Sequence, residues 1–180
     1  PGETLARVID FFKPYAAKLA AIGFSSFGPL GLNPATSTYG HVTATPKPGW
    51  SGFDILSPIR QAFQLPIAFD LDVNAAAYGE WYWVDENHAC DPLVYFTIGT
   101  GIGAGIVVNG RLVHGLVHPE AGHMRIPHDP LRDPFPGSCP FHGDCFEGLA
   151  NGPAISARWN TKGEDLPENH PAWELEAEYI

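Results

Sequence analysis

The sequence predicts an α/β fold made of two parts, and three observations support this prediction. In the first half, short apolar runs alternate with segments whose apolar residues have helical spacing. In the second half, apolar runs flank Asn109-Gly110, a dipeptide typical of two-residue hairpin turns. A polar, charged segment, 85–92, separates the halves. We expect a lobe boundary there, with residues 1–91 in one lobe and 92–180 in the other.

The elements of the first half follow from apolar spacing and from turn residues. Pro14 is expected to end the first helix, and Ser57 and Pro58 to begin the second, with Ser57 as its N-cap. In order, we expect a helix at 4–13, a strand at 19–26, a long polar excursion at 33–52, a helix at 57–64, a strand at 66–69 and a helix at 74–83.

In the second half, the hairpin signal predicts a β-meander. We expect strands at 93–98, 104–108 and 111–113, a helix beginning at 153–159 and a helical stretch at 173–180. Residues 114–152 contain few apolar runs. We therefore expect that segment to stay irregular unless something holds it together.

Charge and composition exclude several classes of partner. The chain has 10 basic and 20 acidic residues and a net charge of −10, which argues against nucleic acid and anionic membranes as partners. No run is long and apolar enough to span a bilayer, and the first residues do not have the pattern of a secretory leader. Three cysteines, an odd number, favour a reducing compartment, so we expect a cytoplasmic protein.

The most specific motif is a group of histidine and cysteine residues. Cys139, His142 and Cys145 lie at intervals of three, and His123 lies upstream. Thiolate and imidazole ligands favour tetrahedral zinc, and four protein ligands make a structural site that would order this segment. Two free thiols or a disulfide between the two cysteines are the alternatives to a metal. The rival fourth ligands are His114, His118 and His128.

Glycine and acidic residues supply the other candidates. Gly99-Thr-Gly-Ile-Gly103 predicts a turn whose backbone N–H groups can bind phosphate, although such turns are also common without a ligand. Asp72, between a strand and a helix, is placed either to act as a general base or to cap the helix. Glu120 and Glu147 flank the predicted metal ligands and could accept hydrogen bonds from a polyhydroxyl ligand, or lie solvated on the surface.

Taken together, these motifs resemble the ROK family of sugar kinases, in particular its bacterial fructokinase branch. The resemblance implies an actin-like, ribonuclease-H-like fold of two α/β lobes, here partial and with a zinc-bound loop, and an active site between the lobes. The segments that carry it are SFGPLG (26–31), DVNAAAYGE (72–80), TIGTGIGAG (97–105), HPEAGH (118–123) and CPFHGDCFEG (139–148).

The resemblance also implies roles for individual residues. Asp72 would be the catalytic base that takes the proton of the sugar hydroxyl attacking the γ-phosphate of ATP. Glu120, His123 and Glu147 would bind sugar hydroxyls, with His123 also a zinc ligand. The residues near the ATP phosphates would be Gly99, Thr100, Gly101 and Gly103, and those near the rim of the sugar site Gly31 and Asn33. Family members commonly form homodimers and use Mg²⁺ with ATP.

Two departures and two missing motifs refine this prediction. Leu71 stands where many ROK glucokinases have Asn, and His142 replaces a cysteine of their zinc loop; both resemble the fructokinase branch. The family's N-terminal Asp-x-Gly-Gly-Thr motif and C-terminal Gly-Gly-Gly stretch are not found. Since the only methionine is Met124 and the sequence starts at Pro1, we expect an internal piece of a longer protein, with removal of an initiator methionine as the alternative.

We therefore expect ATP-dependent phosphorylation of a hexose, D-fructose to fructose 6-phosphate, by the full-length protein, and no activity of the piece alone. One alternative is a sugar-responsive transcriptional repressor, which has the same core with a DNA-binding extension. Another is a zinc-stabilised sugar-binding domain without activity.

Overall fold

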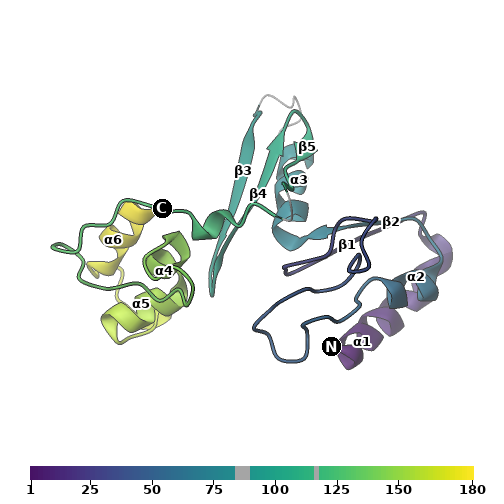
Figure 1. Ribbon diagram of the computed structural model, residues 1–180, viewed down its shortest axis with the longest axis horizontal. Helices are drawn as coiled ribbons and strands as arrows, with labels where there is room; N and C mark the ends of the chain where they lie inside the picture. Colours follow the sequence, from purple (N-terminus) through teal and green to yellow (C-terminus); the bar gives the residue numbers. More distant parts are fainter. Residues whose placement is uncertain (84–89, 116–117) are drawn as a thin grey trace.

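The computed structural model describes residues 1–83, 90–115 and 118–180. Two small sheets are arranged with helices, and Figure 1 shows their order along the chain. The elements are α1 (Gly2–Phe12), η1 (Lys13–Lys18), β1 (Ile22–Ser26), α2 (Ser57–Phe63), β2 (Ile67–Leu71), α3 (Asp72–Trp83), β3 (Leu93–Ile98), β4 (Ile102–Val108), β5 (Arg111–Leu112), η2 (Ala121–His123), α4 (Phe146–Ala150), α5 (Gly152–Trp159), η3 (Gly163–Asp165) and α6 (Ala172–Tyr179).

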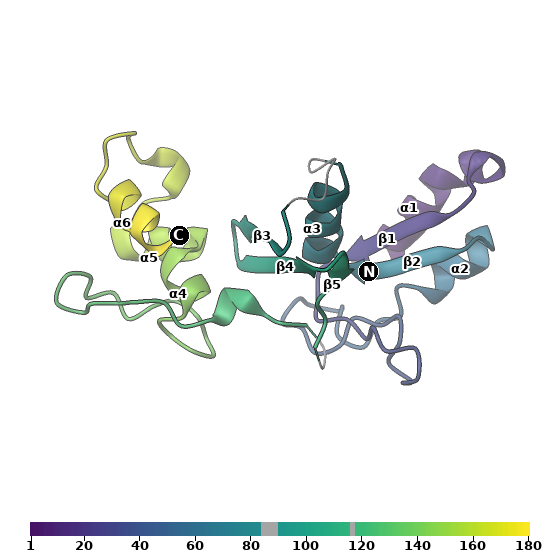
Figure 2. The same cartoon turned by 90° about the horizontal axis from the view of Figure 1, so that it is seen from above.

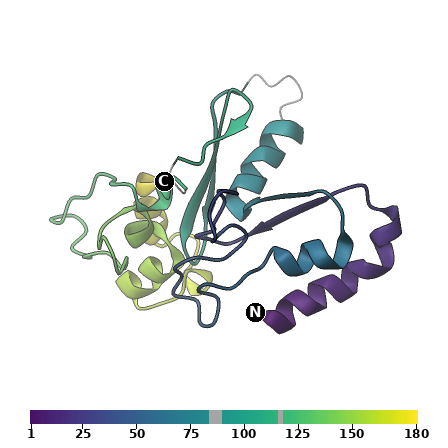
Figure 3. The same cartoon turned by 45° about the vertical axis from the view of Figure 1, so that its right-hand side comes forward.

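The first sheet consists of β1 and β2, which are parallel and pair from Ile22 with Ile67 to Ser26 with Leu71. α1 and α2 lie next to each other beside this sheet (Figure 3). Their buried side chains pack with residues of both strands. Both predicted strands are confirmed, although β1 begins later than expected and β2 extends to residue 71. β2 therefore delivers Asp70 in the strand and Asp72 at the first position of α3.

The second sheet is the antiparallel meander β3-β4-β5 that the sequence predicts. Asn109 and Gly110 both have positive φ, 51° and 69°, as a type I′ hairpin turn requires. α3 packs directly on β4 at Gly105, where a Cβ atom would lie 2.1 Å from the carbonyl oxygen of Val73. This close approach joins the end of the first sheet to the second.

Figure 2 shows the sequence of parts from one end of the molecule to the other. The first sheet with α1 and α2 lies at one end, α3 and the second sheet lie in the middle, and α4–α6 form the other end. The segment expected to separate two lobes, 85–92, falls mostly outside the described residues, so the boundary stays a prediction. Among the described residues, no helix combines the length and apolar character that a membrane span needs.

The predicted start of α2 is wrong in detail, whereas the predicted end of α1 is confirmed. Ser57 is the first residue of α2 and not its N-cap; instead the Asp54 carboxylate accepts hydrogen bonds from the N–H groups of Leu56, at 3.1 Å, and Ser57, at 2.9 Å. The predicted end of the first helix is confirmed, since α1 ends at Phe12, shortly before Pro14. Pro14 itself lies in the first turn of a 3-10 helix, where its missing N–H is tolerated. The cap of α2 was not predicted because a carboxylate outside the helix is a weak signal in sequence.

The described part of 114–152 is largely irregular, as expected, except for η2 and for α4, a helix that the sequence did not predict. The C-terminal helices surround a buried ionic cluster with one cation and two carboxylates. Arg158 lies 3.1 Å from Asp133 and 3.2 Å from Glu176, and donates a hydrogen bond to the carbonyl of Leu149. Burial alone would raise the pKa of Asp133, but hydrogen bonds from Tyr179 and Arg158 hold it below its usual value.

Glu176 is left under-compensated in this cluster. Burial raises its pKa to about 7 from a usual 4.5, although Arg158 acts to lower it. Its Oε2 atom has no hydrogen-bond partner among the described residues. The folded state therefore favours the protonated carboxyl, and ionisation of Glu176 lowers the free energy of unfolding.

Glu176→Gln in the full-length protein is expected to change how stability depends on pH. Because the folded pKa lies above the unfolded one, the wild-type contribution is complete below about pH 4.5 and is lost as pH rises through about 7. The variant should lack this loss. Its free energy of unfolding relative to that of wild type should therefore increase by about 1–3 kcal/mol from pH 4.5 to pH 8. Urea unfolding at both pH values measures the difference. Glu174→Gln, an exposed site on the same helix, is the control; an equal gain there would contradict the assignment.

Candidate active site and metal centre

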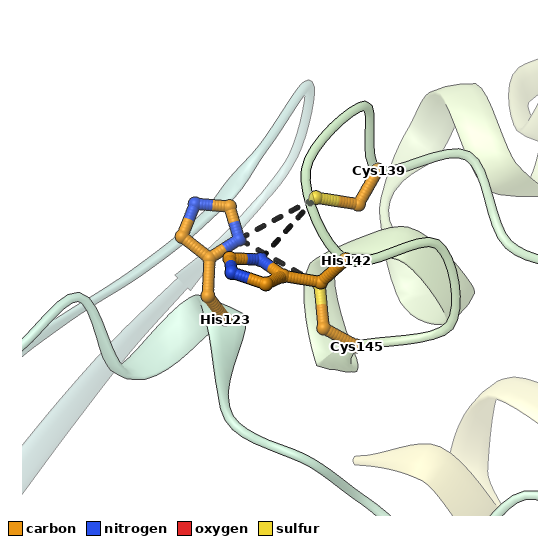
Figure 4. A group of neighbouring side chains, drawn as sticks. All are labelled: His123, Cys139, His142 and Cys145. Carbon is orange, nitrogen blue, oxygen red and sulfur yellow. Dashed lines mark hydrogen bonds between the residues drawn. The ribbon is translucent and has the colours of Figure 1, made fainter.

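All four predicted metal ligands lie together (Figure 4). Their ligand atoms are all within 4.8 Å of one another. His123 Nδ1 lies 3.6 Å from the sulfur of Cys139 and 3.6 Å from that of Cys145, and His142 Nδ1 lies 3.8 Å from the sulfur of Cys139. Four ligands at roughly 2.0–2.3 Å from a tetrahedral zinc ion are separated by roughly 3.3–3.8 Å, so the group fits that ion.

Backbone geometry shapes this group. The chain folds back between Cys139 and Gly143, whose backbone groups exchange two hydrogen bonds of 3.2 and 2.9 Å. Gly143 has φ of 64°, which a glycine adopts without strain, and Gly148 approaches so closely that its Cβ would lie 1.9 Å from the Gly143 oxygen. Cys145 immediately precedes α4 and so has a fixed position.

The chemistry of the donors also suits a metal. Burial raises the pKa of the Cys145 thiol, and the neighbouring Cys139 acts in the same direction. The buried Cys145 thiol therefore loses its proton less readily unless a cation compensates the charge of the thiolate, which is what zinc does on binding. Both cysteines are free, and two rival ligands are engaged elsewhere, His114 with Asp70 and His128 with the Asp133 carbonyl.

The glycine-rich turn lies against the residues that follow the metal group. Gly99, Thr100 and Gly101 are exposed. The carbonyl of Gly99 accepts a hydrogen bond from Gly152 N–H at 2.8 Å, and that of Thr100 accepts one from the Asn151 side chain at 3.2 Å. Residues at the start of α5 thus hold the carbonyl groups of the turn, while Gly99, Thr100 and Gly101 remain exposed to solvent.

Glu147 contacts this turn. Its Oε2 atom accepts a hydrogen bond of 2.9 Å from the N–H of Ile102, and a Cβ atom on Gly101 would lie only 2.7 Å from the same oxygen. The structure therefore brings the predicted sugar ligand Glu147 next to the predicted phosphate turn. Gly103 lies within β4, one residue beyond this contact.

Asp72 is exposed at the start of α3. Its Oδ1 atom accepts a hydrogen bond of 2.9 Å from the N–H of Val73, the next residue. This is not the bond to the second or third helical N–H that defines an N-cap, so the capping alternative has no support in the geometry. The carboxylate is free to face solvent or a ligand.

A cavity of about 600 Å³ opens beside the end of β2. It contains both predicted rim residues, Gly31 and Asn33, but not Asp72, Glu120, His123 or Glu147. The residues that line it are Leu30, Gly31, Leu32, Asn33, Thr36, Thr38, Thr43, Phe69, Asp70, His114 and Gly115.

Asp70 and His114 are the two residues that sequence reasoning missed as site members. From the sequence, His114 is only a rival metal ligand, and no pattern singles out Asp70. They lie 2.6 Å apart although 44 residues separate them in sequence. The signal that could have found Asp70 is its place two residues before Asp72, at the same end of a strand.

His118 lies within electrostatic range of several carboxylates. Burial lowers the pKa of His118, while the charges of Glu120, Asp70 and Asp72 act to raise it. These three carboxylates therefore lie within electrostatic range of one imidazole. Asp72 and Glu120 thus act on the same imidazole as the cavity residue Asp70, whereas His123 lies in the metal group and Glu147 at the glycine turn. The roles of these residues stay predictions.

Helices that pack on a parallel pair of strands and on an antiparallel meander make this an α/β protein, as the sequence predicted. The chain belongs to the ROK family, whose model matches residues 2–175. This confirms the family predicted from the motifs.

Individual relatives agree with this membership. A relative from Bacillus subtilis (strain 168) is 49% identical over 180 residues, which is 100% of this chain and 59% of the relative. A fructokinase from Lactococcus lactis subsp. cremoris is 44% identical over 180 residues, 100% of this chain and 60% of that protein. The chain thus spans about three fifths of the length of these relatives.

The fold is also that of a solved structure. The ROK hexokinase from Thermus thermophilus superimposes with a TM-score of 0.72 at 24% sequence identity, covering 97% of this chain and 62% of that one. At this identity the likeness shows the fold. The predicted actin-like α/β architecture is thereby confirmed.

Proposed function

We propose that the full-length protein phosphorylates a hexose with ATP, and that the substrate is D-fructose, which yields fructose 6-phosphate. The observation that carries the proposal is the exposed Asp72 carboxylate at the junction of β2 and α3, beside a cavity lined with hydroxyl and amide groups. The choice of fructose is supported by the fructokinases among the relatives.

In this proposal, Asp72 acts as the general base. It accepts the proton of the sugar hydroxyl as that oxygen attacks the γ-phosphorus of ATP, and it orients the hydroxyl for in-line attack. Its exposed position, with one backbone hydrogen bond and no paired cation in the described structure, leaves it able to do so. Mg²⁺, when bound with ATP, neutralises charge on the phosphates.

The glycine turn is the proposed phosphate contact. Its residues are Gly99, Thr100, Gly101 and Gly103, of which the first three are exposed. Because the Gly99 N–H already donates to the Gly101 carbonyl at 2.9 Å, the proposal relies on the backbone N–H groups of the other residues. A side chain at residue 101 would collide with Glu147, which favours glycine at this position.

Zinc is proposed to have a structural role. His123, Cys139, His142 and Cys145 would hold it, and with four protein ligands no position remains for a reacting water. The ion would fix η2, and with it the backbone that carries Glu120 and His123 toward the sugar.

The test is an assay of ADP formation by the full-length protein with fructose, glucose and mannose. We expect the highest kcat/KM with fructose. Absence of ATP-dependent transfer to all three hexoses would overturn the proposal. Residues 1–180 alone are expected to bind fructose without turnover, because they span only about three fifths of the relatives' length.

A further inference from the structure

The Asp70 carboxylate, which contacts His114, has three neighbouring hydrogen-bond donor groups. Asp70 Oδ1 accepts hydrogen bonds of 2.7 Å from the N–H of Leu71 and of 2.7 Å from the Asn74 side chain. Its Oδ2 atom lies 2.6 Å from His114 Nε2. Every contact of this carboxylate in the described structure is thus with a donor, so the Asp70 side chain is held from three sides.

This arrangement fixes which nitrogen of His114 carries a proton. An ionised carboxylate only accepts hydrogen bonds, so His114 Nε2 must donate to Asp70. In the neutral ring the other nitrogen, Nδ1, is then an acceptor. An aspartate behind a histidine commonly sets the tautomer and the ring orientation in this way.

Both residues line the cavity, and they differ in exposure. The His114 side chain is 39% exposed and that of Asp70 19%. His114 is therefore the member of the pair that a ligand can reach, and Nδ1 is its only nitrogen not already used by Asp70.

The remaining lining indicates the chemical class of that ligand. Its other polar side chains are neutral, namely Asn33, Thr36, Thr38 and Thr43, and the described lining includes no lysine or arginine. Hydroxyl and amide groups suit a neutral polyol, whereas an anionic or phosphorylated sugar would need a cation.

We propose that His114 is a specificity-determining residue whose Nδ1 atom accepts a hydrogen bond from one hydroxyl group of the bound hexose, with Asp70 as the positioning residue that holds its ring. The inference rests on the proposed function, because it takes the cavity as part of the sugar site. It adds a sugar contact that comes from the segment after β5.

Two substitutions at residue 114 separate this role from a purely structural one. In His114→Gln the amide nitrogen can still reach Asp70, but no acceptor stands in the place of Nδ1. In His114→Asn the carbonyl oxygen can take the place of Nδ1, but the side chain is too short to reach Asp70. A sugar contact predicts the greater loss of fructose affinity in His114→Gln. A purely structural bridge between β2 and the segment after β5 predicts the greater loss in His114→Asn.

We expect His114→Gln in the full-length protein to raise the KM and the Kd for fructose about tenfold, with kcat changed less than about threefold, and His114→Asn to retain more affinity. Calorimetric titration with fructose, in the absence of ATP, gives the Kd. His170→Gln, outside the cavity lining, is the control. Wild-type affinity in His114→Gln, or greater damage in Asn than in Gln, would overturn the proposal.

A series of monodeoxy fructose analogues identifies the hydroxyl group. One analogue should bind wild type about tenfold more weakly than fructose, and this penalty should vanish in His114→Gln. If every penalty persists in the variant, His114 contacts no hydroxyl. If wild type binds fructose without phosphorylating it, the proposed function fails and the inference stands on binding alone; if it does not bind fructose, both fail.

Discussion

Asp72→Asn in the full-length protein is expected to lower kcat by about 10²–10⁴-fold and to change the KM for fructose by less than about threefold. The amide keeps the size of the side chain and can still accept the hydrogen bond from Val73 N–H, so the start of α3 should be preserved. It cannot accept the proton of the sugar hydroxyl. Steady-state kinetics with fructose as the varied substrate measure both constants.

The matched control for this prediction is Asp10→Asn, an exposed carboxylate on α1. It should have wild-type kinetics. A kcat within tenfold of wild type for Asp72→Asn would show that another group takes the proton. A similar loss in both fructose binding and kcat would instead point to local damage at the β2–α3 junction.

Loss of the metal is expected to have the second large effect. Cys145→Ser removes a buried ligand, and because structural zinc contributes about 10–16 kcal/mol through four ligands, affinity for zinc should fall at least about 100-fold. Residues 118–150 should then exchange amide hydrogens faster, and fructose binding should weaken in parallel. Elemental analysis, hydrogen exchange and calorimetry follow these three quantities, and chelation of the wild-type protein should reproduce them.

Cys90→Ser is the control for cysteine chemistry in general, since Cys90 is exposed and lies outside the metal group. It should keep one zinc per chain. Absence of zinc from protein purified without chelator would contradict the proposed metal site. Fructose binding that survives chelation would show that the sugar site does not depend on the metal.

The sequence by itself determined the features that depend on residues close together in the chain. Asn109-Gly110 produces a hairpin because both residues tolerate positive φ, whatever surrounds them. The intervals of three among Cys139, His142 and Cys145 fit a tight loop around an ion. Most helices and strands could be predicted from apolar spacing, which is also a local pattern. The capping role of Asp54 at α2 could not be predicted, because Ser57 is an equally good cap residue.

Tertiary structure decided the features that join distant segments. It selected His123 among four candidate histidines, because η2 packs on the start of β4, where Gly122 lies against the carbonyl of Ile102. It also paired Asp70 with His114 across 44 residues and Glu147 with Ile102 across 45. No local pattern encodes such contacts, since they depend on how two sheets and α3 are oriented by packing at positions such as Gly105. The sequence was therefore sufficient to predict which residue types could bind a metal, whereas the packing of the whole chain determined which side chains contact one another.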